Sequence, residues 1–394
     1  MTWTPLFSFF ILILIFAIGN EVSLATRSVF SLMLFSSIVH LIGYWTGLIP
    51  TDSVMNTYLP SMLTAYLLPI IVANLGTMMD INQLLGEWKT VVLCLLSLAA
   101  LGIVSFTVGT FLFGEYAVIA SVPISGGGVA TILIGDACIE NGRPDLAGFA
   151  ALCNSMDLLI GLPMGAFMIR GQLVHMQKEG KLLSREALYA GEKQLPQINR
   201  LNWKRKPAWW TRPYPMLARV TLIALIAYIP AQYTSVPHPI WCLLFGIIAS
   251  QCGFLELNSL QNAGYWNFLL IVQLCNQPRL LAGVTWDSFK SMILPAFGML
   301  LLGAVTLMLS GLIIGKFLRM PARTSCAVAL TAMIGYPNTM LISQDAVATL
   351  KDASEEEKAV ALGYALPKML VGGFTTVTFA SVAYASIAAQ IFFG

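Results

Sequence analysis

The stretch Ser121-Val-Pro-Ile-Ser-Gly-Gly-Gly-Val-Ala-Thr-Ile-Leu-Ile-Gly-Asp136 lies within an apolar run, yet it carries a proline and three consecutive glycines. In a helix interior, glycine costs about 1 kcal/mol and proline about 3 kcal/mol relative to alanine. Unwound backbone is tolerated at membrane depth only where protein buries it or a watery cavity receives it. We therefore predict that Gly126, Gly127 and Gly128 break a helix and expose backbone N–H and C=O groups to a solute. A tight helix crossing, which small residues also allow, is the alternative.

A second interrupted stretch, Thr331–Ala346, has the same layout in the other half of the chain. Flanking apolar segments keep their order in both halves, which indicates an old internal duplication. Two interrupted segments in corresponding positions are a sequence indication of a transporter binding site. At one constant offset, the two stretches align Gly126 with Gly335, Asp136 with Asp345 and Ala137 with Ala346.

The composition is that of a membrane protein. Of 394 residues, 57% are hydrophobic and only 10% charged, whereas soluble domains carry about 25% charged residues. The net charge of +3 does not suggest nucleic-acid binding. The seven cysteines show no CxxC spacing, and three scattered histidines make neither a convincing metal site nor a catalytic centre. We expect an all-α polytopic membrane protein that is not an enzyme.

The apolar segments divide the chain into two repeats, residues 1–171 and 214–394, around a basic linker at 172–213. Expected elements in the first half are spans at 1–20, 28–49, 53–79 and 90–114, the broken stretch 116–138 and a helix at 146–171. Those in the second half are spans at 215–234, 239–256, 264–283 and 291–315, the broken stretch 335–345 and a helix at 357–392.

The basic linker sets the predicted topology. Residues 170–212 hold nearly half of the 22 lysines and arginines, so this loop should be cytoplasmic. If the broken stretches are re-entrant hairpins, each half crosses the membrane five times, the repeats are inverted and both termini lie outside. Two full crossings would instead give twelve spans and parallel halves, and charge bias does not separate these arrangements. We favour hairpins, because inverted repeats accompany broken helices at the midplane of many transporters.

Three ionisable residues lie inside otherwise apolar helices: Asp157, Arg279 and Lys368. A charge at the bilayer centre costs about 2.5–3.5 kcal/mol on insertion scales, so each needs a partner or a function. Lys368 is predicted to be the counter-charge of an anionic substrate or a built-in cation that replaces a coupling ion. An ion pair between Asp157 and Lys368 is the structural alternative. Arg279, near a span end, is either a substrate ligand or an interface anchor.

Other polar groups lie near the broken stretches. Carboxylates, carbonyls and hydroxyls are the ligands that a hard cation prefers, although Asp136 and Asp345 could instead cap helices. The candidate Na⁺ ligands are Asp136, Asn154, Asp157, Ser343 and Asp345, with H⁺ as the other possible coupling ion. The candidate substrate-binding residues are Ser125, Gly126, Gly127, Gly128, Gly335, Tyr336, Pro337, Asn338, Thr339, Arg279 and Lys368.

At these residues the sequence resembles the bacterial sodium/glutamate symporter family and its relatives, among them the 2-hydroxycarboxylate transporters. Ser125–Gly128 is similar to the family's Ser-Gly-Gly-x-Gly motif, and Gly335–Thr339 looks like the loop of the second repeat. The resemblance implies two inverted repeats with re-entrant loops, an elevator mechanism, a dimerising scaffold and an inner-membrane location. We expect the scaffold at roughly 1–50 and 214–256 and the transport core at roughly 58–171 and 264–394.

The sequence therefore predicts a secondary active transporter of a small organic anion, glutamate or another carboxylate, driven by Na⁺ or H⁺. Its partners would be this solute, membrane lipid and a second copy of the chain. A uniporter or exchanger is the alternative within transport, and an ion channel or a membrane enzyme comes from a different class. A channel would gather identical polar rings by oligomerisation, whereas two non-identical loops in one chain fit alternating access better.

The inverted arrangement makes a prediction about the two termini. In a cysteine-depleted background, single cysteines placed at Thr2 and Gly394 should react with an impermeant thiol reagent from outside the cell. A cysteine in the 172–213 linker should react only after permeabilisation. Labelling of both termini solely from the cytoplasmic side would contradict inverted repeats with five crossings each.

Overall fold

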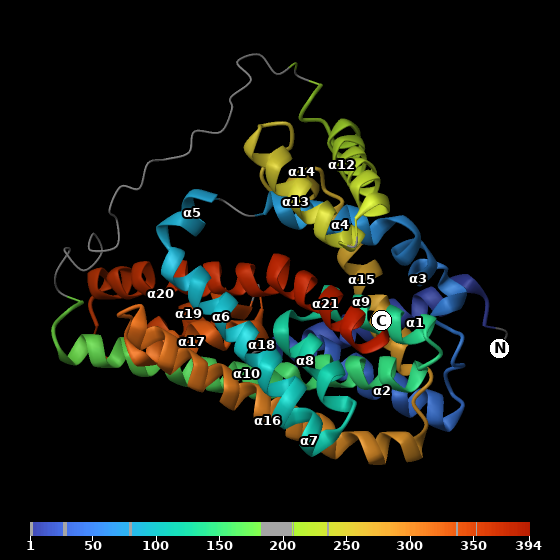
Figure 1. The fold of residues 1–394 in the computed structure, drawn as a ribbon, viewed down its shortest axis with the longest axis horizontal. Coiled ribbons are helices and arrows are strands. Elements are labelled where there is room, and N and C mark those ends of the chain that lie inside the picture. Colours follow the sequence, from blue (N-terminus) through green and yellow to red (C-terminus); the bar gives the residue numbers. More distant parts are fainter. Residues whose placement is uncertain are drawn as a thin grey trace. The chain divides into compact units, whose positions relative to one another are not determined.

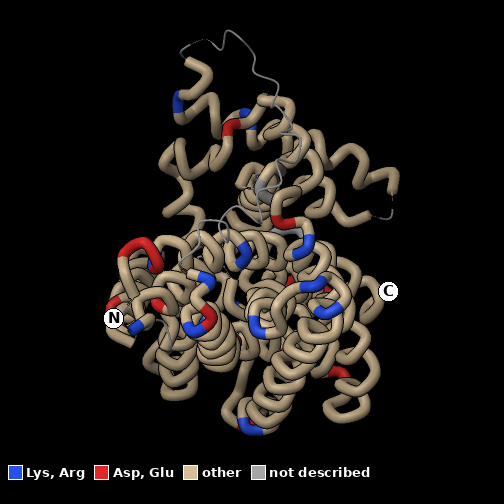
Figure 2. The backbone as a smooth tube through the Cα atoms, turned by 90° about the vertical axis from the view of Figure 1, so that its left-hand side faces the viewer, with Lys and Arg blue, Asp and Glu red and all other residues tan. Residues whose placement is uncertain are grey.

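The computed structural model describes residues 3–26, 30–78, 81–182, 207, 209–234, 236–335, 338–351 and 353–394. Throughout these ranges the regular structure is helical, with no strand (Figure 1). Charged residues are few, so most of the backbone tube in Figure 2 is tan. The length and apolarity of six helices confirm a membrane-embedded helical protein. They are α1 (Pro5–Ala25), the run α3–α4 (Leu59–Thr77), the run α6–α7 (Trp88–Phe113), α10 (Pro144–Lys178), α12 (Pro213–Tyr233) and α16 (Trp286–Phe317).

Shorter helices complete the fold. Two of the long runs contain a π-helical turn, Leu63–Leu67 and Ser105–Gly109. The shorter elements are α2 (Leu32–Thr46), α5 (Ile81–Gly86), α8 (Tyr116–Gly126), α9 (Gly128–Glu140), α13 (His238–Gln251), α14 (Ser259–Asn262), α15 (Trp266–Leu281), α17 (Ala322–Ala329), α18 (Thr331–Ile334), α19 (Asn338–Ala348), α20 (Glu355–Thr375), the π-helical turn η4 (Thr376–Ala380) and α21 (Ser381–Phe393).

The chain forms two compact units. Unit 1 contains residues 1–17, 36–81 and 197–283, and unit 2 contains 18–35, 82–196 and 284–394. Each unit thus takes segments from both halves of the sequence. The units do not have the bounds given above for the scaffold and the core, since α3–α4 and α15 belong to unit 1 and Ile18–Phe35 belongs to unit 2. Which unit moves during function stays a prediction.

Unit 1 is built on a close crossing of α4 (Leu68–Thr77) and α13. A Cβ added at Gly246 would overlap the carbonyl oxygen of Ala73, and one added at Gly76 would lie 2.6 Å from the backbone nitrogen of Ile247. Glycine therefore lets the two backbones approach each other, as in other tight helix pairs of membrane proteins. Nearby, the buried Asn74 amide oxygen accepts a hydrogen bond from the backbone N–H of Leu260 at 3.0 Å.

In unit 2, residues Tyr116–Glu140 fold into a helical hairpin, named hairpin 1. Its arms α8 and α9 pack on each other and are joined at Gly127. Arg143, after the second arm, pairs with Glu115, before the first arm, at 2.6 Å. Both ends of the hairpin therefore lie at the start of α10, and α8 continues along α10 from a contact between the rings of Tyr116 and Phe149.

Residues Ala322–Ala348 form a second helical hairpin, named hairpin 2. Its first arm is α17–α18, its second arm is α19, and the helix breaks at Gly335. Arg323 donates to the Gly171 carbonyl at 2.7 Å, and Gln177 donates to the Lys351 carbonyl at 2.8 Å. The base of hairpin 2 thus lies at the C-terminal end of α10. The two hairpins approach this helix from opposite ends (Figure 1).

The last helical run, α20–η4–α21, passes both hairpins. It begins with a capping box, in which the Ser354 hydroxyl accepts from the Glu357 N–H and the Glu357 carboxylate accepts from the Ser354 N–H. Three glutamates in its first turn complement the helix dipole. The π-helical turn η4 interrupts the run where it packs against α8 and α18.

The glycine crossing in unit 1 generates a stability prediction. Gly246→Ala should lower the melting temperature of the purified protein by several degrees, because the new methyl group overlaps the Ala73 carbonyl and forces α4 and α13 apart. Gly86→Ala is the matched control, since nothing lies within 4 Å of its added Cβ. An equal melting temperature for the two variants would contradict the close crossing.

Candidate functional site

Both hairpin tips use a backbone conformation that only glycine adopts readily. Gly127 has φ 76° and ψ −147°, and Gly335 has φ 65° and ψ 167°. A side chain in this region costs on the order of 1–3 kcal/mol. The prediction that the glycine stretch breaks a helix is therefore confirmed at Gly127, while Gly126 ends one arm and Gly128 begins the next. The break of hairpin 1 thus lies at Gly127, one residue after Gly126, which the sequence alignment pairs with Gly335.

The two tips meet the same segment, the π-helical turn η4. A Cβ added at Gly126 would lie 2.5 Å from the carbonyl oxygen of Thr376, and one added at Gly335 would lie 3.0 Å from Cγ2 of Val377. The Tyr384 hydroxyl, one turn beyond η4, contacts the Ser121 hydroxyl of hairpin 1 at 2.8 Å. Unwound turns of this kind are frequent at functional sites, and here one turn brings the two breaks to the same part of unit 2.

Helix α10 places both tips at one level. In hairpin 1, Tyr116 is level with Phe149 of α10. The helix rises about 15 Å over the ten residues from Tyr116 to Gly126, so the tip is level with about residue 159 of α10. Hairpin 2 runs along α10 in the opposite direction. Arg323, near its start, binds the Gly171 carbonyl, and Met333, further along the first arm, lies at Gly161, where an added Cβ would be 2.7 Å away. Its tip follows two residues after Met333. Both tips therefore lie near the middle of this 35-residue helix.

Asp157 lies at this level, one helical turn before Gly161 and on the same face of α10. The side chain is 3% exposed, and its Oδ1 atom has no hydrogen-bond partner among the described residues. A buried carboxylate oxygen without a partner carries a large desolvation cost, so it calls for a proton, a cation or another donor. This is the strongest polar anomaly of unit 2.

The tips also present the polar ends of four helices. The helices α9 and α19 begin at the two breaks, where their first N–H groups carry partial positive charge and suit an anion. The arms α8 and α18 end there, so their last carbonyl groups face the same region and suit a cation. Beside hairpin 2, the buried hydroxyls of Thr339 and Thr375 have no partner among the described residues. The site can therefore serve both signs of charge.

Several predicted polar ligands already have intramolecular partners. The Ser125 hydroxyl donates to the Val122 carbonyl at 2.7 Å, and the Ser343 hydroxyl donates to the Thr339 carbonyl at 2.8 Å. The Asn338 amide lies at 3.4 Å from the Ile334 carbonyl. These bonds leave acceptor lone pairs on Ser125 and Ser343 and the amide oxygen on Asn338 for a ligand. Tyr336 and Pro337 lie outside the described residues.

The two aspartates that close the broken stretches are not at the tips. Asp136 is nine residues beyond Gly127 and Asp345 ten beyond Gly335, which is about 13–15 Å along each arm. Asp345 is exposed. The structure therefore does not bring these carboxylates to Asp157, because each stands on the far part of its returning arm. Asn154 does lie one turn from Asp157. Among described residues, no three His, Cys, Asp or Glu side chains form a metal-binding group.

Lys368 has a partner that the sequence did not suggest. Its Nζ lies 3.0 Å from Oε1 of Glu87, with exposed fractions of 21% and 22% for the two side chains, and 4.8 Å from the Tyr364 ring centre. The expected pair with Asp157 is not formed. Equivalent positions in two repeats need not be neighbours. Val377 lies at the level of the tips, and Lys368 precedes it by nine residues, which is about 13 Å along the helix. Its charge is compensated without a substrate.

Arg279 belongs to α15 in unit 1, whereas the two hairpins belong to unit 2, so its role as a substrate ligand stays a prediction. Within unit 1 it follows the buried Asn276, whose amide oxygen and nitrogen both lack a partner among described residues. The sequence analysis did not predict the turn η4, because this turn contains no glycine or proline. It also did not predict that Gly161 and Gly165 pack against hairpin 2. Their small-xxx-small spacing is a signal for close helix packing that could have identified this face.

The Lys368–Glu87 pair generates a coupling prediction. Lys368→Met and Glu87→Gln should each destabilise unit 2, because each leaves the other charge half-buried without its partner. The double variant should recover part of the loss, with a coupling on the order of 1–3 kcal/mol in a thermodynamic cycle of unfolding. Lys368→Met combined with Asp157→Asn should show no comparable recovery. Additive effects for Lys368 with Glu87 would contradict the assigned pair.

No protein-family model matches this chain, and no curated protein matches it either. The resemblance to the sodium/glutamate symporters therefore stays an expectation that rests on the two glycine motifs. The function is accordingly argued from the geometry of the hairpins.

Proposed function

We propose that this protein is a secondary active transporter of a small organic anion, coupled to Na⁺ or H⁺. The observation that carries the proposal is the meeting of two glycine-broken hairpins, entering from opposite ends of α10, beside the unpartnered carboxylate of Asp157. Transporters bind substrate where discontinuous helices meet near the bilayer midplane. A packing role alone would not need two backbone breaks at the same level of one helix.

The anion would bind to the N-terminal ends of α9 and α19. Backbone N–H groups at these ends are neutral donors with partial positive charge, which suits a carboxylate. Asn338 and Thr339 flank this region on hairpin 2, while Ser125 and Gly127 flank it on hairpin 1. Neither Lys368 nor Asp345 is assigned to the substrate, because the first is paired with Glu87 and the second stands far along its arm. Carboxylates such as glutamate are the substrate class.

The coupling cation would bind at Asp157. Its free carboxylate oxygen, the carbonyl groups that end α8 and α18, and Asn154 supply oxygen ligands of the kind that Na⁺ takes, and the same carboxylate can instead accept a proton. Occupation by either cation removes the cost of an unpaired buried charge. Binding of the cation would thus favour the closed arrangement of the hairpins and link the ion gradient to substrate binding.

Alternating access would follow from movement of one unit relative to the other, as in an elevator. In this proposal unit 2 carries the solute between the hairpin tips and unit 1 forms the scaffold that contacts lipid and a second copy of the chain. The positive residues of the 172–213 linker would hold that loop in the cytoplasm, with both termini outside the inner membrane. A uniporter or exchanger would use the same hairpins without an ion, and an ion channel would need a continuous polar path.

The first test is uptake by proteoliposomes of labelled glutamate, succinate, citrate and malate, with a Na⁺ gradient, a pH gradient or neither. Gly127→Leu should abolish uptake of the transported anion, whereas Gly127→Ala should retain part of it. Both variants carry the same backbone strain, and nothing lies within 4 Å of the added Cβ, so their difference reports the space that the solute needs. Wild-type uptake by Gly127→Leu would contradict a site at this tip.

A second test concerns the coupling ion. Asp157→Asn keeps the size of the side chain and removes its charge, so gradient-driven uptake should fall at least tenfold while exchange of labelled for unlabelled substrate persists. The loss should appear with whichever gradient drives the wild type. Asn154→Ala removes a second proposed cation ligand from the same helix, so it should also lower driven uptake where Na⁺ is the coupling ion. Unchanged driven uptake in Asp157→Asn would exclude this carboxylate from coupling.

A further inference from the structure

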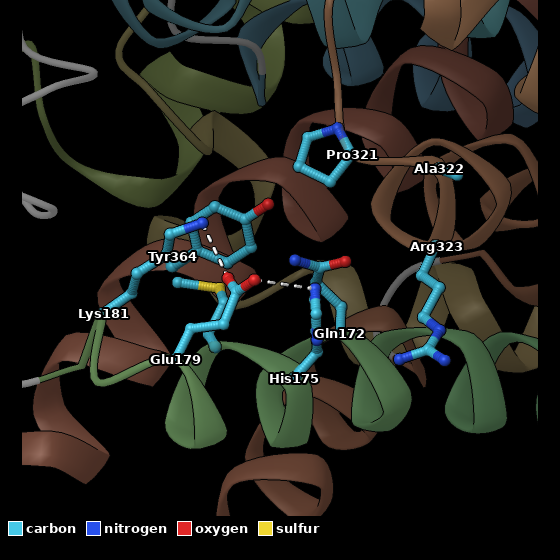
Figure 3. Close-up of a pocket in the computed structure, with 9 residues that line it drawn as sticks. Gln172, His175, Glu179, Lys181, Pro321, Ala322, Arg323 and Tyr364 are labelled. Atoms are coloured by element: carbon cyan, nitrogen blue, oxygen red, sulfur yellow. Dashed lines mark ion pairs between the residues drawn. The ribbon is translucent and has the colours of Figure 1, made fainter.

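The base of hairpin 2 contains a cavity that plays no part in the proposed transport site. Its volume is about 450 Å³, within the range of small-molecule sites. The lining residues come from the end of α10 and the turn after it, from the start of α17 and from α20, all in unit 2 (Figure 3). They are Gln172, His175, Met176, Glu179, Lys181, Pro321, Ala322, Arg323 and Tyr364.

Gln172 is the central polar group of this cavity. Its side chain is only 6% exposed, and no hydrogen bond satisfies its carboxamide among the described residues. In the view of Figure 3 the carboxamide lies next to His175, and Arg323 stands to the right of both. The carboxamide has two donor hydrogens and an acceptor oxygen. These atoms are not among the fully buried polar atoms, so they reach the open space of the cavity. A ligand in the cavity would satisfy them.

The charged groups of the cavity leave an excess of positive charge. Glu179 is already compensated, since it pairs with Lys181 at 2.7 Å and with His175 at 3.3 Å. The hydrogen bond from Lys181, together with the nearby His175 and Lys181 charges, lowers the pKa of this carboxyl. Arg323 uses one guanidinium nitrogen on the Gly171 carbonyl and forms no ion pair among the described residues. Its remaining donors are available to an anion.

Backbone donors add to the positive field. Helix α17 begins at Ala322 with Pro321 as its N-cap residue, and no side chain caps its first turn. The first N–H groups of α17 therefore lack an intrahelical acceptor and lie at the rim of the cavity. Tyr364 and Met176 add apolar surface to the lining. The lining thus combines a planar cation, an amide, free backbone N–H groups and an apolar wall.

We infer that this cavity is a second binding site, specific for a small organic carboxylate. Arg323 would hold the carboxylate through its planar fork of donors. Gln172 and the first N–H groups of α17 would complete the ligand's hydrogen bonds, and its carbon skeleton would lie on Tyr364 and Met176. The inference rests on the cavity alone and does not require that the hairpin tips transport anything.

A ligand here would act as a clamp on hairpin 2. The cavity lies between the end of α10 and the start of α17, next to the Arg323–Gly171 hydrogen bond that joins them. A bound carboxylate bridging Arg323 and Gln172 would add a second connection between the same two helices. Occupation would therefore stabilise the base of the hairpin, and the melting temperature would rise with ligand concentration, because a ligand that binds only the folded state stabilises it.

The experiment measures succinate binding to the purified full-length chain by calorimetry, with inorganic phosphate in parallel. Succinate should bind the wild type and, with unchanged affinity, Gly127→Leu, in which the hairpin tip is filled. Arg323→Gln and Gln172→Leu should each weaken binding at least tenfold, and Arg323→Lys should lie between them and the wild type. Lys316→Gln, an exposed basic residue outside the cavity, is the matched control and should bind normally.

Three results would overturn the inference. They are loss of succinate binding in Gly127→Leu, equal affinities of Arg323→Gln and the wild type, and tighter binding of phosphate than of succinate. Melting curves without ligand verify that each variant is folded. If Arg323→Gln unfolds, the succinate affinity of Arg323→Lys is compared with that of the wild type instead. Failure of this test leaves the uptake assay unaffected, and failure of uptake leaves the succinate titration interpretable.

Discussion

The constraint that governs this structure is that backbone polar groups inside a bilayer must find partners within the protein. A continuous helix satisfies them automatically, so a break at membrane depth persists only where other segments surround it. Gly127 and Gly335 are two such breaks. Gly126, which ends the first arm of hairpin 1, and Gly335 both lie against the turn η4, which is itself a departure from regular α-helix. Concentrating three irregular segments in one place lets each shield the others from lipid.

Helix α10 provides the frame in which these breaks are arranged. At the N-terminal end of α10, the Arg143–Glu115 pair closes the base of hairpin 1. Towards the C-terminal end of α10, Arg323 holds the base of hairpin 2 on the Gly171 carbonyl. Glycines at positions 161 and 165 remove the side chains that would keep hairpin 2 away. The middle of the same helix carries Asp157, so the element that fixes the tips also supplies the carboxylate between them.

The charged residues divide according to whether the fold compensates them. Lys368 and Glu87 neutralise each other between α20 and the start of α6, a structural role that resolves the insertion cost of this lysine. Asp157 has no such partner for its Oδ1 atom among the described residues, which distinguishes it from the other intramembrane charge of unit 2. Arg323 and Gln172, at the base of hairpin 2, present unsatisfied donors to a cavity outside the tips. The sites proposed for ligands are therefore those where a polar or charged side chain lacks a partner in the protein, and a charged residue that already has a partner does not mark a site.

The sequence by itself determined the membrane class, the location of most helices and the two breaks, because hydropathy and glycine content act locally on each segment. It also singled out Asp157 and Lys368 as charges that need an explanation. Only the tertiary structure decided their partners: Lys368 meets Glu87 across 281 residues, and no local pattern encodes that distance. It likewise decided that Asp136 and Asp345 stand away from the tips, and that η4 joins both breaks. These positions depend on how the helices pack against each other. Packing involves the surfaces of helices that are far apart in the sequence, so no single segment predicts it.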